Sequence, residues 1–150
     1  MISRFGRCLV YLWVLPTSFV ASPFVVGAII EGRARIVDGV LEIHGGLARF
    51  WLQNAAGLVL RGGASAMTLG HVVLGVDQKA LDQTRFHERI HVRQCEWFGP
   101  FFLPAYLLSS LLLWMSGKDA YRQNPFERQA FRAAPAGSER HDPGGGRRAN

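Results

Sequence analysis

The sequence predicts an α+β fold: short antiparallel strands, a long central helix and C-terminal helices, preceded by a hydrophobic helix at the N-terminus. Residues 33–76 contain short apolar segments separated by glycine-containing turns, which is typical of paired strands. Residues 82–98 contain no Gly or Pro and place apolar side chains at helical spacing. Residues 8–30 carry no charge and are numerous enough to span a bilayer.

These observations divide the chain into three parts. We expect residues 1–32 to form a membrane anchor or signal segment, and residues 33–133 to form one folded domain. Residues 134–150 are rich in Gly, Pro and Arg and predict a disordered tail. An apolar content of 49% is sufficient for the core of one small domain.

The uncharged N-terminal run has two interpretations. We favour an uncleaved anchor, in which Pro16 and Pro23 kink a membrane helix and membrane lipid is a partner. The alternative is a signal peptide cleaved after Ala28, which would make the protein secreted or periplasmic. The first interpretation predicts a membrane-associated protein, held at the inner membrane if the chain is bacterial.

Four strand segments are expected between the N-terminal run and the long helix. Asp38-Gly39 is a strong turn signal and predicts a hairpin within residues 33–45. Residues 48–53 and 57–63 could form further strands, and residues 67–76 read as one more strand before the helix.

The predicted helix of residues 82–98 has clear start and stop signals. Asp82 or Thr84 can cap its N-terminus, and Gly99 followed by Pro100 ends it. Helical spacing predicts three groups of side chains. The first group is a core stripe of Phe86, Ile90 and Trp97. The second lies beside it and consists of His87, His91, Gln94 and Cys95. The third is a solvated side formed by Arg85, Arg89, Arg93 and Glu96.

The same helix carries the pentapeptide HExxH at residues 87–91. Two histidines four residues apart share one helix face, so His87 and His91 can bind one metal ion. Glu88 lies beside that face, where a carboxylate can deprotonate a metal-bound water. This pattern predicts a zinc site, and the alternative is a polar helix whose histidines only form hydrogen bonds.

A catalytic zinc site needs a third protein ligand and one position open to water. Downstream of the helix, Asp119 and Glu127 are the two candidates outside the tail. Asn124 can cap a C-terminal helix whose first residue is Pro125, which would place Glu127 in the first helical turn.

The HExxH motif and the C-terminal segment together resemble a known family of metallopeptidases. HExxH followed by a glutamate from a later helix resembles the gluzincin metallopeptidases, and the segments HERIHVRQ and NPFERQAF resemble small bacterial HExxH proteins with a downstream N-P-x-E-x-x-A helix. The resemblance covers about residues 68–131. It implies a minimal zincin-like domain with Zn²⁺ on His87, His91 and Glu127, Glu88 as general base, and the last strand beside a cleft for a peptide or protein substrate.

The sequence departs from better-known gluzincins in one respect. Those with an E-x-x-x-D pattern place an aspartate four residues after the ligand glutamate, whereas this chain has Phe131 there. The partner that orients a zinc histidine must then be Asp77, Asn124 or a backbone carbonyl. The metzincin spacing is also absent, because Trp97 stands six residues after His91. Candidates for stabilising an oxyanion, each more typical of a structural role, are His71, Tyr106 and Tyr121.

A second hydrophobic run, residues 97–115, constrains the membrane arrangement. If it crossed a bilayer about 30 Å thick, His91 and Glu127 would lie on opposite sides and could not share an ion. We therefore expect this run to be buried, re-entrant or lying on a surface. The net charge of +6 comes from scattered Arg and Lys residues, so we expect no nucleic-acid partner.

Together these features predict a zinc-dependent hydrolase, a membrane-associated metallopeptidase with an HExxH-plus-Glu site. The alternative is a non-catalytic membrane protein, either a degenerate zincin or a structural metal-binding protein. Cys8 and Cys95 do not indicate a disulfide framework.

Overall fold

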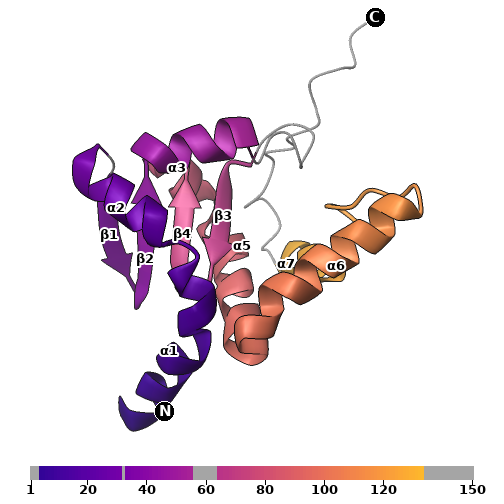
Figure 1. Ribbon diagram of the computed structural model, residues 1–150, viewed down its shortest axis with the longest axis horizontal. Helices are drawn as coiled ribbons and strands as arrows, with labels where there is room; N and C mark the ends of the chain where they lie inside the picture. The colour runs from indigo at the N-terminus through magenta and orange to yellow at the C-terminus, as the bar shows by residue number, and fades with distance from the viewer. Residues whose placement is uncertain (1–3, 32, 56–63, 134–150) are drawn as a thin grey trace, which may run out of the picture.

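The computed structural model describes residues 4–31, 33–55 and 64–133 (Figure 1). The tail expected at residues 134–150 and the strand expected at residues 57–63 lie outside these ranges. The elements follow in the order α1 (Arg4–Phe19), α2 (Ser22–Ile30), β1 (Arg33–Val37), β2 (Val40–His44), α3 (Gly46–Phe50), the π-helical turn η1 (Trp51–Ala55), β3 (Ala66–Leu69), β4 (Val72–Gly75), α5 (Gln78–Phe98), the 3₁₀ turn η2 (Gly99–Phe101), α6 (Phe102–Met115) and α7 (Pro125–Ala133).

The four strands form one sheet in the order β1-β2-β4-β3. The outer pairs β1–β2 and β3–β4 are antiparallel, whereas β2 and β4 run parallel. The α+β class is therefore as predicted, but the sheet is mixed and not wholly antiparallel. The parallel pair is possible because the chain leaves β2, forms α3 and η1 over the sheet, and returns to it through β3.

The first hairpin is confirmed and two strand predictions are wrong. Asp38 (φ 48°) and Gly39 (φ 80°) both have the positive φ that a tight two-residue hairpin turn requires. Residues 67–76 form two strands, not one, because the chain reverses at Gly70, whose φ is 66°. Residues 48–53 are helical, since Ala48 and Leu52 bury side chains four residues apart.

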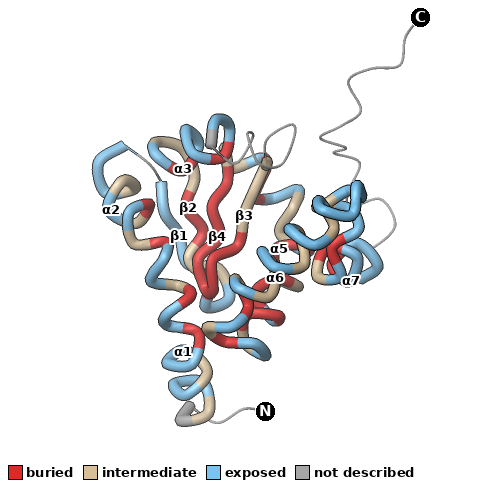
Figure 2. The backbone as a smooth tube through the Cα atoms, turned by 45° about the vertical axis from the view of Figure 1, so that its right-hand side comes forward, coloured by how far each residue is buried: buried red, intermediate tan, exposed pale blue. Residues whose placement is uncertain are grey.

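The sheet is the middle of three layers (Figures 1 and 2). On one face α2 and α3 complete a core whose members include Phe24, Ile43, Ala48, Leu52 and Leu74. On the opposite face α5 packs through Leu81 and Val92 against Val40 and Val73. Successive strand residues point to opposite faces, so β2 serves both cores, and β4 is buried along its whole length.

Helix α5 begins earlier than the sequence predicts. Asp77 caps it, accepting a hydrogen bond from the Ala80 amide at 2.7 Å, so the first helical residue is Gln78. The predicted cap Thr84 instead donates to the carbonyl of Ala80 within the helix. The predicted end is confirmed, because α5 stops at Phe98 and Gly99 has φ 55°.

A buried carboxylate fixes α5 against the first hairpin. Glu42 on β2 accepts hydrogen bonds from Arg35 at 2.9 and 3.0 Å and from Arg85 at 3.0 and 3.2 Å. Arg89 lies 3.7 Å from the same carboxylate and donates to the carbonyl of Val37. The two helix arginines, which were expected to be solvated, therefore anchor the segment that carries HExxH.

The N-terminal run forms two helices that pack on the domain. The chain bends by 77° between α1 and α2, and Pro23 lies in the first turn of α2. Thr17 donates to the carbonyl of Gly99 at 2.9 Å, and Val14 is fully buried. The bend lies beside Pro23, as predicted, whereas Pro16 stays within α1, so the run is two helices and not one straight helix.

The second hydrophobic run folds back on α5. By length and composition residues 78–115 are long and apolar enough to cross a membrane. In one straight helix, however, His91 and Tyr106 would lie about 22 Å apart. Their ring centroids are 6.4 Å apart, so the chain reverses around Gly99 and α6 returns beside the HExxH segment. Most of the bulky side chains of α6 are exposed, so it is not a buried core helix.

Candidate metal centre

The structure brings together the three residues predicted to bind metal. His87 and His91 come from successive turns of α5, and Glu127 comes from the first turn of α7. The Nε2 atoms of the histidines are 3.0 Å apart, and Glu127 Oε2 lies 3.0 Å from that of His87. Glu127 Oε1 lies 3.3 Å from His91 Nε2, and all three residues are buried.

This arrangement fits a zinc ion by donor type and by spacing. Two imidazole nitrogens and one carboxylate form a ligand set found in catalytic zinc sites. Ligand atoms about 2.05 Å from a tetrahedral ion are separated by about 3.3 Å. The two Nε2 atoms are 3.0 Å apart, and each lies 3.0 or 3.3 Å from one oxygen of the Glu127 carboxylate, Oε2 for His87 and Oε1 for His91, so the separations are close to those of a zinc site. Among the residues that the structure describes, this is the one group that fits a metal ion.

The charges of the group are mutually stabilised. Burial opposes ionisation of Glu127, but hydrogen bonds and charges from His87 and His91 outweigh it and hold the pKa of this carboxyl at about 2. Burial likewise opposes protonation of His91, and the Glu127 carboxylate outweighs it and raises the pKa of the imidazole. Glu127 therefore stays ionised, as a carboxylate ligand must be, and a bound cation would displace the proton that this carboxylate favours on His91.

Glu88, the predicted general base, is buried beside the group and is held by the sheet. Thr68 on β3 donates a hydrogen bond to Glu88 Oε2 at 2.6 Å. Burial raises the pKa of Glu88 above its ordinary value, although the neighbouring histidines act in the opposite direction. A raised pKa favours a carboxylate that must accept a proton at neutral pH. The resemblance had placed the last strand beside the cleft, but no motif singled out Thr68 as the partner of Glu88.

Gln94 orients His91, whereas the sequence had suggested Asp77, Asn124 or a backbone carbonyl as the group that orients a zinc histidine. Gln94 Nε2 donates to the carbonyl of Phe126 at 3.0 Å and to Gln129 at 2.9 Å, which turns its Oε1 toward His91. His91 Nδ1 lies 2.8 Å from Oε1 and must donate to it. The Nε2 of His91 then presents its lone pair to the site. The predicted helical stripe already placed Gln94 beside the histidines, and this spacing was the sequence feature from which its role could have been predicted.

The residues first suggested for this orienting role have other tasks. Asp77 caps α5, and Asn124 caps α7 by accepting from the Phe126 amide at 3.0 Å. The Asn124 side chain also donates to the carbonyl of Tyr106 and to Ser110, so it ties α7 to α6. The predicted start of α7 at Pro125 is confirmed.

The three oxyanion candidates differ in position. Tyr106 on α6 donates to Glu127 Oε1 at 2.7 Å and therefore borders the metal group. His71 lies beside Glu96 at 3.2 Å and against the ring of Tyr11, away from this group. Tyr121 packs edge-on against Phe131. Tyr106 is therefore the candidate whose hydroxyl contacts a predicted ligand, Glu127.

Asp119, the other candidate for third ligand, does not enter the group. Its carboxylate accepts from the amides of Tyr121 and Arg122 at 2.9 and 2.7 Å and stabilises the turn before α7. Of the two candidates for the third ligand, Glu127 therefore lies with the histidines, whereas Asp119 stabilises the turn before α7.

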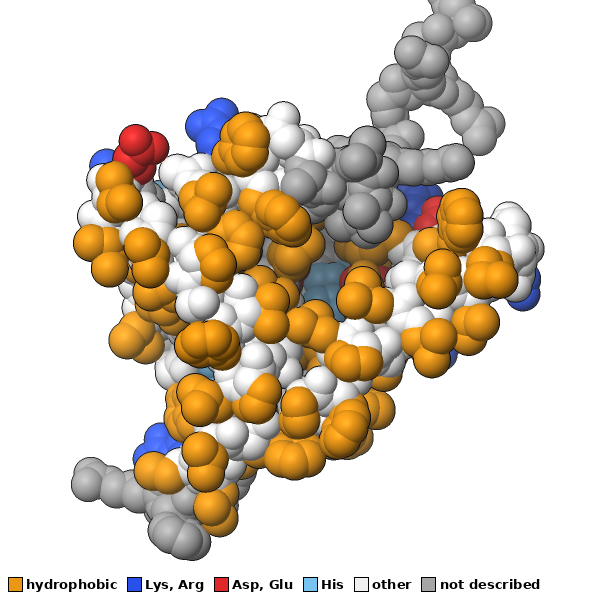
Figure 3. All heavy atoms as spheres, in the orientation of Figure 1, with side chains coloured by type: hydrophobic (Ala, Val, Ile, Leu, Met, Phe, Trp, Pro, Cys, Tyr) orange, Lys and Arg blue, Asp and Glu red, His pale blue; other side chains and the backbone are white. Residues whose placement is uncertain are grey.

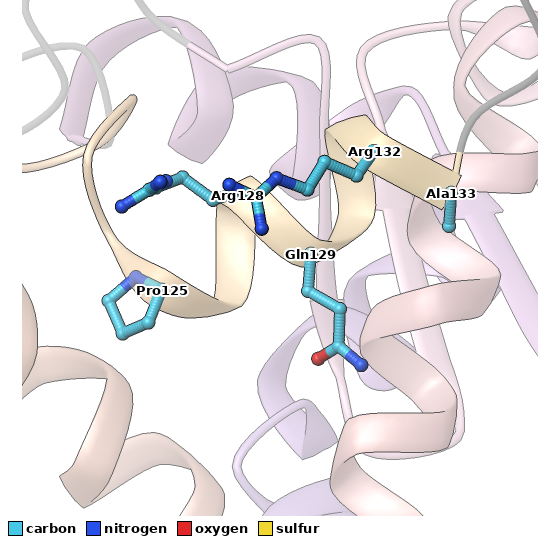
Figure 4. Close-up of a pocket in the computed structure, with 5 residues that line it drawn as sticks. All are labelled: Pro125, Arg128, Gln129, Arg132 and Ala133. Carbon is cyan, nitrogen blue, oxygen red and sulfur yellow. The ribbon is translucent and has the colours of Figure 1, made fainter.

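A cavity of about 450 Å³ runs along the outer side of α7 (Figure 4). Its lining residues are Pro125, Arg128, Gln129, Arg132 and Ala133. Figure 4 shows Arg128 and Arg132 directed to one side of the helix and Gln129 to another. The metal-binding group contributes no residue to this lining, so the cavity is separate from the candidate metal centre.

Comparison with protein-family models, with curated proteins and with solved structures found no match for this chain.

Proposed function

We propose that the protein is a zinc-dependent hydrolase, specifically a membrane-associated metallopeptidase. In this proposal His87, His91 and Glu127 bind zinc and Glu88 is the general base. One observation carries it: ligand atoms of three buried residues, two from the HExxH helix α5 and one from α7, lie within 4.8 Å of one another, and a buried carboxyl adjoins them.

The residues of the chain have distinct tasks in the proposed reaction. When bound, zinc would polarise the scissile carbonyl and acidify the attacking water. Glu88 would take a proton from that water and pass it to the leaving amine. Its Oε2 is occupied by the Thr68 hydroxyl, which leaves Oε1 for the proton. Gln94 would keep the Nε2 of His91 unprotonated, and Tyr106 would hold the Glu127 carboxylate.

The position of β3 supports a peptide substrate. This strand lies at the end of the sheet order, and its Thr68 contacts the proposed base. An extended peptide can pair with an edge strand through main-chain hydrogen bonds, which would bring a scissile bond beside Glu88. The proposal therefore assigns substrate alignment to β3, in place of the single long strand that the sequence predicted.

We also propose that the N-terminal run binds membrane lipid. The run is uncharged from Cys8 to Ile30, and many of its bulky side chains are exposed on α1 and α2. Such a run should retain the protein in membranes during an alkaline carbonate wash.

Substitution of Glu88 tests the chemistry. Glu88→Gln preserves the shape and the contact with Thr68 but cannot accept the proton, so it should retain zinc and lose hydrolysis of a peptide library by at least about 100-fold. Glu96→Gln is the matched control, because Glu96 lies on the same helix beside His71. If Glu88→Gln cleaves as fast as wild type, the assigned base is wrong. If the zinc-loaded wild type cleaves nothing in the library, the non-catalytic alternative is favoured.

A further inference from the structure

Three helices from two distant parts of the sequence, α1 with α2 and α6, present one broad apolar face. Figure 3 shows hydrophobic side chains gathered over α1, α2 and α6 on the same side of the molecule. We call this surface the apolar face, and exposed members on the three helices are Leu12, Trp13, Ile29, Leu108, Leu112 and Trp114. A surface of this extent is unusual for a protein that is surrounded only by water.

The face is continuous because the two hydrophobic runs meet. The rings of Trp13 on α1 and Phe101 on η2 lie 6.4 Å apart, and both side chains are partly exposed. Beneath them Val14 and Phe102 share one buried cluster, and Thr17 bonds to the carbonyl of Gly99. A Cβ atom at Gly99 would collide with the Trp13 ring, so the absence of a side chain there permits the close approach.

The composition of the face matches lipid better than a protein partner. Residues 8–30 and 97–117 contain no charged side chain, whereas protein interfaces usually have a polar rim with paired hydrogen bonds. Charged side chains stand at the four ends of these runs, Arg7 and Glu31 around the first and Glu96 and Lys118 around the second. Tryptophan is enriched where proteins meet the lipid–water boundary. All four tryptophans of this chain are between 42 and 80% exposed.

The geometry also indicates that these helices do not cross the bilayer. Helix α6 has 14 residues, which span about 21 Å and fall short of a hydrocarbon core of about 30 Å. After α6 the chain returns to α7, where Glu127 meets His91. Helices α1 and α2 are bent by 77° and are held by buried contacts to the domain.

We propose that the apolar face binds a lipid bilayer and seats α1, α2 and α6 in a single leaflet, so that none of the described residues (4–31, 33–55 and 64–133) crosses the membrane. Figure 3 also shows histidine side chains in a hollow bordered by hydrophobic side chains on this side of the molecule. His91 packs near Phe102 and Tyr106 of α6, so the candidate metal centre lies beside the proposed lipid surface. If the proposed hydrolase function holds, its substrates are polypeptide segments held at the same leaflet.

Vesicle flotation of the full chain tests the lipid surface. The probes are phosphatidylcholine–phosphatidylglycerol vesicles, mixed with protein after removal of detergent. Leu12→Glu, Ile29→Glu and Leu108→Glu place a charge on three exposed positions, one on each helix. Each should lower the vesicle-bound to free ratio by about tenfold or more. Phe86→Glu is the control, because Phe86 is exposed on α5, on the other side of the sheet from α2.

Two results of this experiment would overturn the proposal. Apolar-face variants that float as well as wild type, with unchanged circular dichroism, would show that lipid does not contact these helices. A wild type that stays soluble as a dimer without detergent and does not float would assign the face to a second copy of the chain. Neither result depends on zinc or on hydrolysis, so the proposed function is tested separately.

Labelling of cysteines from one side of a sealed membrane tests whether the helices lie in a single leaflet. Lys79→Cys lies at the start of the 78–115 stretch and Lys118→Cys lies after its end, and both positions are exposed. In a Cys8→Ser background the remaining thiol, Cys95, is buried. An impermeant maleimide applied to sealed membranes should label both introduced cysteines from the same side. Labelling from opposite sides would mean that the stretch crosses the bilayer, and the proposal would be wrong.

Discussion

Gln94 offers a sharp test of how the candidate metal centre is organised. Its Oε1 lies 2.8 Å from His91 Nδ1 in a buried setting, so it fixes which nitrogen of the ring carries the proton. Gln94→Met retains the approximate size of the side chain and removes the acceptor. A hydrogen bond that supports a metal ligand contributes about 1.4–2.7 kcal/mol, which corresponds to a 10- to 100-fold loss of zinc affinity.

The assay is competition for zinc between the purified protein and a chelator of known affinity. Two controls separate orientation of His91 from docking of α7. Gln94→Glu keeps an acceptor for Nδ1 but loses the bond to the Phe126 carbonyl, so zinc affinity should remain near that of wild type. Gln129→Ala removes only one partner of the Gln94 amide and should change the affinity little. The reasoning is refuted if Gln94→Met binds zinc within twofold of wild type.

Two further predictions concern the third ligand and the anchoring of α5. Glu127→Ala should lower zinc affinity by at least about 100-fold in the same competition assay, because it removes one of three protein ligands. Asp119→Ala should not lower it. The reverse ranking would transfer the role of third ligand to Asp119. Burial opposes ionisation of Glu42, but Arg85 and Arg35 outweigh it and lower its pKa, so this carboxylate stabilises the fold above its unfolded pKa of about 4.3. Glu42→Gln should cost about 1–3 kcal/mol of unfolding free energy at pH 7 in urea denaturation. The difference from wild type should disappear as the pH falls through the lowered pKa, and a constant difference down to pH 3 would contradict this explanation.

Local patterns predicted much of the fold. The Asp38-Gly39 turn, the end of α5 at Gly99 and the start of α7 after Asn124 each depend on a few adjacent residues, and all three are confirmed. The helical spacing of His87 and His91 likewise placed both side chains on one face. Such features are set by backbone geometry and need no knowledge of the tertiary structure.

The failures occurred where tertiary contacts outweigh local preference. Phe50 and Trp51 favour a strand by propensity, yet the burial of Ala48 and Leu52 on the sheet makes this segment helical. The reversal at Gly70 depends on a close approach to Ser18, far away in the sequence.

The surroundings of the metal group were also beyond local patterns. Thr68, Gln94 and Tyr106 acquire their contacts only when β3, α7 and α6 assemble around α5. The sequence could propose the three ligands from motifs, but residues that orient them are recognised by packing. Similarly, the two hydrophobic runs form a single surface only because η2 and the start of α6 pack against α1.

Metal content of the purified full-length protein tests the zinc site most directly. Wild type, purified without added chelator and analysed by elemental mass spectrometry, should contain about one zinc ion per chain. His87→Ala should contain little or none, since two ligands from this group do not hold the ion as three do. A folded wild type with no bound metal, even after incubation with zinc at micromolar concentration, would contradict the proposed function at its foundation.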